Sequence, residues 1–186
     1  MRTFVAVNLD ETLRARLAEA QRLLKESGAD VKWTDPRGLH ITLKFLGEVE
    51  ESRIPEIGAA IGKALEGCGP FQLKLRGAGT FPSDAAPRVV WVAAAEGEAP
   101  LARMAGRLEE ALEPAGFARE KRPFAAHITL GRARSPRGRE RLAEGVRALA
   151  AEELGEMVVE RAALMKSQLT LQGAIYEPVE EFGLAE

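Results

Sequence analysis

The chain has 186 residues, of which 46% are hydrophobic, and its 26 basic and 28 acidic side chains give a formal charge of -2. This length suits one domain or two small lobes that share a core, and the near-neutral charge excludes a strongly basic nucleic-acid coat. The single cysteine, Cys68, excludes an internal disulfide and a multi-thiolate metal site. The sequence shows neither a signal-peptide core nor an apolar run long enough to cross a membrane. We therefore expect a cytoplasmic protein without membrane association.

The first half of the chain alternates strand and helix patterns in the order β-α-β-α-β. Asp10 is a suitable N-cap for an amphipathic helix that Gly28 ends. Period-two alternation predicts the strands, and apolar residues three and four apart predict the helices. The predicted elements are a strand at 3–9, a helix at 11–26, extended segments at 31–35 and 39–49, a helix at 54–65 and a strand at 71–75.

The second half repeats this order. The predicted elements are a strand at 88–94, a helix at 101–112, a strand at 126–133, a helix at 137–149 and a mainly extended segment at 157–171, which 174–176 continue. The Gly- and Pro-rich segment 77–88 is predicted to be a surface loop between two lobes. We therefore expect one internally duplicated domain, 1–186, with halves of roughly 1–80 and 81–186 whose terminal strands can exchange between lobes.

The tetrapeptide HITL occurs at 40–43 and again at 127–130, and these two copies contain both histidines of the chain. Alternate side chains of a strand share a face, so we expect His40, Thr42 and Lys44 to point one way and the apolar residues the other. His127 and Thr129 should share a face in the same manner. A lone strand histidine is more often a surface or core residue, but the repeated context favours a paired role.

Two imidazoles, each beside a hydroxyl, can act as general acid and general base near neutral pH. The threonine hydroxyls and Lys44 would supply donors and positive charge for a phosphate. This chemistry needs no metal or cofactor. A zinc site is a poorer interpretation: an Asp or Glu could supply the third ligand, but the threonines stay unexplained and HExxH-type spacing is absent. The motifs of serine hydrolases, P-loop enzymes and dinucleotide-binding proteins are absent, and Cys68 is interpreted as structural or incidental rather than nucleophilic.

The paired HxTx motifs, about ninety residues apart, resemble those of the two-histidine phosphoesterase superfamily. The chain looks like the bacterial RNA 2′,3′-cyclic phosphodiesterases, also called 2′-5′ RNA ligases (LigT-like). The similar segments span nearly the whole chain: RTFVAVNL, VKWTDPRGLHITLKFLGEV, GTFPSDAAPRVVW, RPFAAHITLGRAR and LTLQGAIYEPVEEFGL. The resemblance implies a bilobal α+β fold of duplicated β-α-β-α-β units, with antiparallel sheets around a central cleft.

The same resemblance implies a hydrolase that opens RNA 2′,3′-cyclic phosphates to 2′-phosphates without a cofactor. Some members also join tRNA halves through a 2′-5′ linkage. The expected partner is therefore RNA with cyclic phosphate ends, tRNA fragments included, and the expected state is a monomer. By position, His40 would donate a proton to the leaving O3′, and His127 would accept one from water. Thr42 and Thr129 would hold phosphate oxygens.

Two basic residues are further candidates for substrate binding. Lys44 shares the parity of His40, whereas Arg132 falls on the opposite face from His127 unless a bulge at Gly131 turns it. Phe45 and Trp33 could stack a base, but core positions are favoured for both. Ala126 stands where the family usually has proline, which leaves the motif itself intact because alanine can adopt the same backbone conformation.

Two other functions stay open at this stage. One is a phosphodiesterase for another cyclic phosphate, such as the one derived from ADP-ribose. The other is a non-catalytic module that binds RNA ends, although binding alone would not require two titratable groups.

Overall fold

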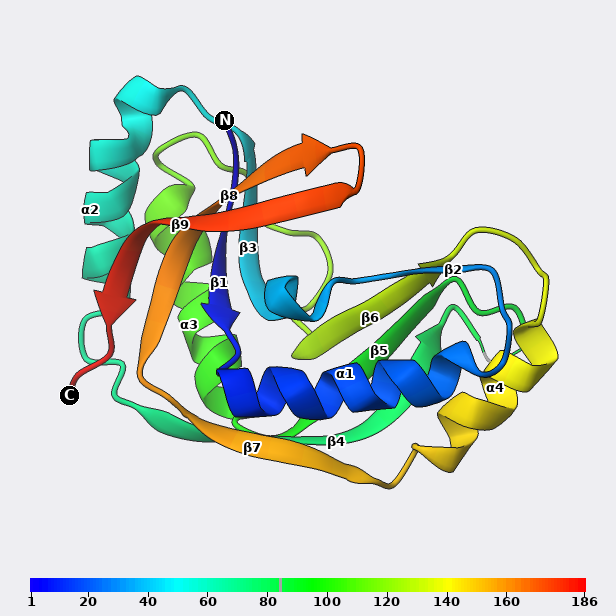
Figure 1. Ribbon diagram of the computed structural model, residues 1–186. Helices are drawn as coiled ribbons and strands as arrows, with labels where there is room; N and C mark the ends of the chain where they lie inside the picture. Colours follow the sequence, from blue (N-terminus) through cyan, green and yellow to red (C-terminus); the bar gives the residue numbers. More distant parts are fainter. Residues whose placement is uncertain (84) are drawn as a thin grey trace.

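The computed structural model describes residues 1–83 and 85–186, and these form two antiparallel sheets with four α-helices (Figure 1). Sheet A has the order β3-β1-β8-β9, with β3 at His40–Glu48, β1 at Arg2–Asn8, β8 at Arg161–Thr170 and β9 at Gly173–Gly183. Sheet B has the order β2-β6-β5-β4-β7, with β2 at Val31–Trp33, β6 at His127–Ala133, β5 at Val89–Glu96, β4 at Phe71–Phe81 and β7 at Glu153–Val159. The α+β class with antiparallel sheets is confirmed.

The helices divide between the two sheets (Figure 1). They are α1 at Glu11–Lys25, α2 at Ile54–Ala64, α3 at Glu98–Leu112 and α4 at Arg139–Ala148. Helices α2 and α3 contact each other, and α3 packs on β3, whereas α1 packs on β7 and α4 on β4. Their apolar faces and one face of each sheet form a single continuous core. No helix in the described part of the chain is long and apolar enough to cross a membrane.

Helix α1 forms as its sequence predicts. The Asp10 carboxylate accepts a 2.8 Å hydrogen bond from the Leu13 amide and so caps the first turn. The residues at helical spacing, Leu13, Leu17, Ala20 and Leu24, are all buried. The observed end at Lys25 lies one residue before the predicted end.

Three strand predictions needed correction. The segment 157–171 is not one strand, because β7 ends at Val159 and β8 begins at Arg161 in the other sheet. β4 continues to Phe81 and so includes the first part of the predicted loop 77–88; residue 84 of that loop lies outside the described residues. β9 is much longer than 174–176. Its charged residues and Pro178 are not typical of a strand and hide its length in the sequence, but a strand at the edge of a sheet tolerates both.

Each sheet combines strands from both halves of the sequence. The first half contributes β1 and β3 to sheet A but β2 and β4 to sheet B, while the C-terminal hairpin β8–β9 completes sheet A. The sheets therefore do not coincide with the halves 1–80 and 81–186. This exchange brings residues near the C-terminus beside the first HITL copy.

Candidate active site

The two HITL copies lie on strands of different sheets that contact each other. His40 begins β3 in sheet A, and His127 begins β6 in sheet B. We call the face of sheet A that carries His40 and Thr42, and the face of sheet B that carries His127 and Thr129, the two histidine faces. The isoleucine and the leucine of each copy are buried in the shared core. The predicted division of each HITL copy into a polar and an apolar face is confirmed.

Both imidazoles are held by the same backbone contact. The Nδ1 atom of His40 lies 2.7 Å from the Gly38 carbonyl oxygen, and that of His127 lies 2.9 Å from the Ala125 carbonyl oxygen. A carbonyl oxygen only accepts hydrogen bonds, so each Nδ1 carries the proton in the neutral ring. Each Nε2 is thereby left as the atom that can accept or donate a proton.

The two sites differ in how much of the ring is covered. His127 is exposed, whereas His40 is partly buried against Phe4 of β1 and Tyr176 of β9. This burial lowers the pKa of the His40 imidazole below its ordinary value, and the hydrogen bond to the Gly38 carbonyl opposes the shift in part. The free protein therefore favours the neutral ring at His40, and the burial that causes this is a feature that HITL itself does not contain.

The two threonines also differ. The Thr42 hydroxyl lies 3.0 Å from Nε2 of His40, while the Thr129 hydroxyl makes no hydrogen bond to a described residue. Both side chains are partly exposed on the histidine faces. Just before the second copy, the carbonyl oxygen of the buried Ala126 accepts a hydrogen bond from the Ala94 amide. This bond fixes the backbone where β6 begins, although the residue there is not proline.

A β-bulge interrupts each HITL strand at the same letter. On β3, Thr42 pairs with Ala6 and Lys44 with Val5, which leaves Leu43 as the extra residue. On β6 the pairing skips Leu130 in the same way. A bulge reverses the parity of every residue that follows it. Strict alternation therefore fails beyond the fourth letter of both motifs.

The expectation that Lys44 shares the face of His40 is wrong for this reason. Its side chain is 1% exposed, and Nζ donates to the Glu109 carboxylate of α3 at 2.9 Å and to the Ala118 carbonyl at 3.0 Å. The same carboxylate accepts a hydrogen bond from the Glu120 amide. Lys44 thus joins β3, α3 and the segment that leads to the second HITL copy.

The second bulge, which lies at Leu130 rather than at Gly131, brings Arg132 to the face of sheet B that carries His127. It is exposed and stands opposite Val89 and Lys32 on the neighbouring strands. Gly131, the counterpart of Lys44, faces the core. A Cβ atom there would lie 2.7 Å from Val31, so this copy has no room for a buried side chain.

Phe45 occupies the position in the first copy that Arg132 occupies in the second. The expected core position for Phe45 is wrong, because it is 61% exposed and its ring centre lies 6.3 Å from that of Phe4 on the His40 face. Trp33 does pack against the core, beside Gly131. Phe4 and Tyr176, which border His40, were not singled out from the sequence. The sequence offers one weak signal for the reversed faces. HITL is followed by Lys44-Phe45 in the first copy and by Gly131-Arg132 in the second, so the basic residue stands at different positions in the two copies.

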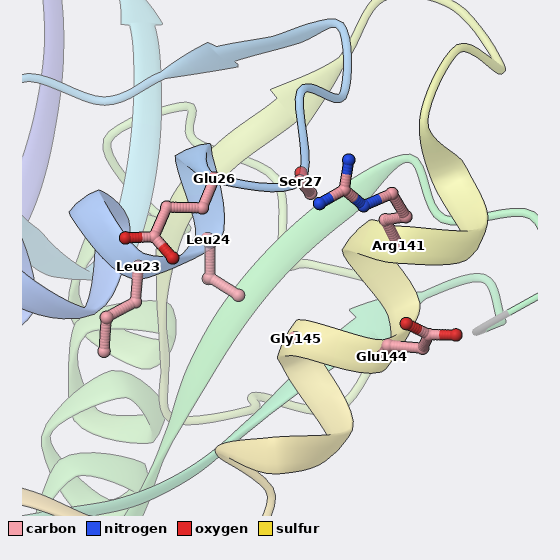
Figure 2. A pocket seen from close by; sticks show the side chains of 7 residues that line it. All are labelled: Leu23, Leu24, Glu26, Ser27, Arg141, Glu144 and Gly145. Carbon is pink, nitrogen blue, oxygen red and sulfur yellow. The ribbon is translucent and has the colours of Figure 1, made fainter.

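A pocket between the C-terminal end of α1 and the middle of α4 is lined by other residues. Figure 2 shows its lining, which consists of Leu23, Leu24, Glu26, Ser27, Arg141, Glu144 and Gly145. None of them belongs to the HITL strands, so we place the candidate active site on the histidine faces. Among residues 1–83 and 85–186, no group of His, Cys, Asp and Glu is arranged to hold a metal ion, and Cys68 is buried.

Comparison with known proteins places this geometry in context. The family model described as the 2′-5′ RNA ligase superfamily matches residues 9–170. A Methanothermobacter thermautotrophicus protein named RNA 2′,3′-cyclic phosphodiesterase is 39% identical over 184 residues, which cover 99% of each chain. A protein of the same name from Archaeoglobus fulgidus is 40% identical over 98% of this chain and 99% of its own.

Solved structures show the same fold. A crystal structure of a Thermus thermophilus protein superposes with a TM-score of 0.82 at 35% identity and covers 99% of this chain and 98% of its own. The apo structure of E. coli LigT gives a TM-score of 0.79 at 24% identity, with 100% of this chain and 98% of that chain covered.

Proposed function

Because the chain belongs to the 2′-5′ RNA ligase superfamily, we propose that it hydrolyses RNA 2′,3′-cyclic phosphate ends to 2′-phosphomonoesters by two-histidine acid and base catalysis without a metal ion. One observation carries the proposal. The two Nδ1 atoms are occupied by equivalent backbone carbonyls, so Nε2 is the ring nitrogen left for proton transfer on each of two strands that contact each other, and at His40 it lies beside the Thr42 hydroxyl. The names of the two curated relatives supply the substrate class.

The reaction needs one proton transfer at each histidine. Nε2 of His127 accepts a proton from water as the water oxygen bonds to phosphorus. The P–O3′ bond breaks, and Nε2 of His40 gives its proton to O3′, which leaves a 2′-phosphomonoester and a 3′-hydroxyl. Thr42 and Thr129 donate hydrogen bonds to the non-bridging oxygens. With an RNA 5′-hydroxyl in place of water, the same two steps form a 2′-5′ linkage.

The residues after each bulge fit two parts of such a substrate. Arg132 carries a planar fork of donors that suits a phosphate, and no carboxylate in the described part of the chain forms an ion pair with it. Phe45 presents an exposed ring on the His40 face, where a terminal base can stack. Lys44 has no part in substrate binding in this proposal, because its ammonium group is already paired in the interior.

A direct assay tests the proposed function. The protein is incubated in EDTA with a 2′,3′-cyclic mononucleotide and with an oligonucleotide that ends in a cyclic phosphate, and the products are identified. We expect full activity with a 2′-phosphate product. A 3′-phosphate would contradict the assignment of O3′ as the leaving group, while binding without turnover would favour an RNA-end binding module. Faster turnover of ADP-ribose cyclic phosphate would move the substrate class to that compound.

Arg132→Ala is expected to lower kcat/KM for the cyclic mononucleotide by about tenfold. A hydrogen bond to a charged group contributes about 1.5 kcal/mol or more, and 1.4 kcal/mol corresponds to tenfold. Steady-state kinetics measure the loss. Arg22→Ala is the matched control, because it removes the same charge from the exposed side of α1. Equal losses in both variants would show that net charge, and not the position of Arg132, is responsible.

The pKa of His40 is expected to rise when phosphate binds. A proton donor must be charged before the reaction, yet burial favours the neutral ring in the free protein. A bound anion favours the imidazolium form and so reverses that preference. NMR titration of the imidazole signals, with and without a 2′-nucleotide, measures the change. A rise at His127 alone would exchange the acid and base assignments.

A further inference from the structure

The strongest feature outside the proton-transfer groups is the packing around His40. Phe4 lies on one side of the imidazole, with ring centres 4.8 Å apart and planes 30° apart. Tyr176 meets the imidazole edge-on from β9, at 5.1 Å and 76°. Tyr176 also meets Phe4 edge-on at 5.4 Å, so the three rings contact one another. His127 has no such ring neighbours among the described residues.

Tyr176 also packs against the backbone that binds His40. A Cβ atom on Gly38 would lie 2.9 Å from the Tyr176 ring, which shows that the ring rests directly on this glycine. The Gly38 carbonyl is the group that accepts from Nδ1 of His40. One side chain therefore contacts both the imidazole and the residue that supplies its hydrogen-bond acceptor.

We propose that Tyr176 is a positioning residue for His40: its ring holds the imidazole against the Gly38 carbonyl and keeps Nε2 directed at the substrate. The ring, and not the hydroxyl, does this, because the hydroxyl makes no hydrogen bond to a described residue. The C-terminal hairpin β8–β9 is thus part of the active site, although neither of its strands contains a HITL residue.

The surroundings of His40 make the titration a specific test. Phe4, Tyr176, the Gly38 carbonyl and the Thr42 hydroxyl face the ring, and of these only Tyr176 is titratable. The largest cause of the lowered His40 pKa is burial, and no charged side chain contributes to it. Removal of the Tyr176 ring should expose the imidazole and raise its pKa toward the ordinary value.

Tyr176→Ala is expected to lower kcat by about tenfold to a hundredfold with a smaller change in KM, because misplaced catalytic groups cost up to about a hundredfold. The His40 NMR titration should move to higher pH, while that of His127, the only other histidine, should stay unchanged. Tyr176→Phe should restore both kcat and the titration. Ile175→Ala, at the neighbouring exposed position of β9, is the matched control.

Gly38→Ala provides an independent variant. Its added methyl group should displace the Tyr176 ring and lower kcat, but it should add little in a Tyr176→Ala background, where the ring is absent. Additive losses in this double-mutant cycle would overturn the coupling. If Tyr176→Ala does not fold, Tyr176→Leu retains apolar bulk and undergoes the same two measurements.

The kinetic part of this inference rests on the proposed function, whereas the titration part does not. Wild-type protein that fails to turn over cyclic phosphates would refute the proposed function and leave the titration to decide the role of Tyr176. An unchanged His40 titration in Tyr176→Ala, in an active enzyme, would refute the positioning role alone. Equal losses in the Phe and Ala variants would assign the effect to the hydroxyl and also overturn the inference.

Discussion

Replacement of either histidine by alanine, His40→Ala or His127→Ala, is expected to lower kcat for a 2′,3′-cyclic mononucleotide by about 10²–10⁴-fold, the usual contribution of a general acid or base. Each ring supplies the only positioned Nε2 atom on its strand. Initial rates measure the effect, and thermal unfolding of the same samples shows whether the fold is intact.

The His127 variant is the cleaner of the two. His127 is exposed, so its loss should leave the unfolding temperature nearly unchanged, whereas His40 also contacts Phe4 and Tyr176. Because the proposed mechanism uses both groups in one reaction, the double variant should be little slower than the worse single variant. Activity near the wild-type level in both single variants would refute the two-histidine mechanism.

Lys44→Met is expected to lower the free energy of unfolding by about 3 kcal/mol. It leaves the Glu109 carboxylate without its buried partner, and removal of one member of such a pair costs about 3–5 kcal/mol. The lower figure applies because Glu109 is 16% exposed. Urea unfolding at pH 7 gives the value directly.

A second substitution separates the charge effect from lost packing. In Lys44→Met/Glu109→Gln, no unpaired charge remains, and the amide oxygen can still accept from the Glu120 amide. We expect this double variant to be more stable than Lys44→Met alone. Lys63→Met, on α2, is the control for loss of a lysine that forms no ion pair with a described residue. A change within about 0.5 kcal/mol for Lys44→Met, as at an ordinary surface site, would contradict the paired role of Lys44.

Local sequence patterns were reliable where the structure depends on near neighbours. The cap at Asp10, the apolar stripe of α1 and the polar face of each HITL copy follow from spacing within one turn or one strand, and all three are present. The long edge strand β9 was largely missed, because its Pro178 and acidic residues are tolerated only at the margin of a sheet.

The sequence by itself determined that each imidazole shares one face of a strand with a hydroxyl, since identical tetrapeptides alternate in the same way, and this repeat is the basis of the prediction that the two histidines act as a pair. It could not determine which residues join them. Register shifts at Leu43 and Leu130 send Lys44 inward and bring Phe45 and Arg132 to the histidine faces. The tertiary structure alone places Tyr176 against His40, because that contact joins residues 136 positions apart through a strand order that local patterns do not encode.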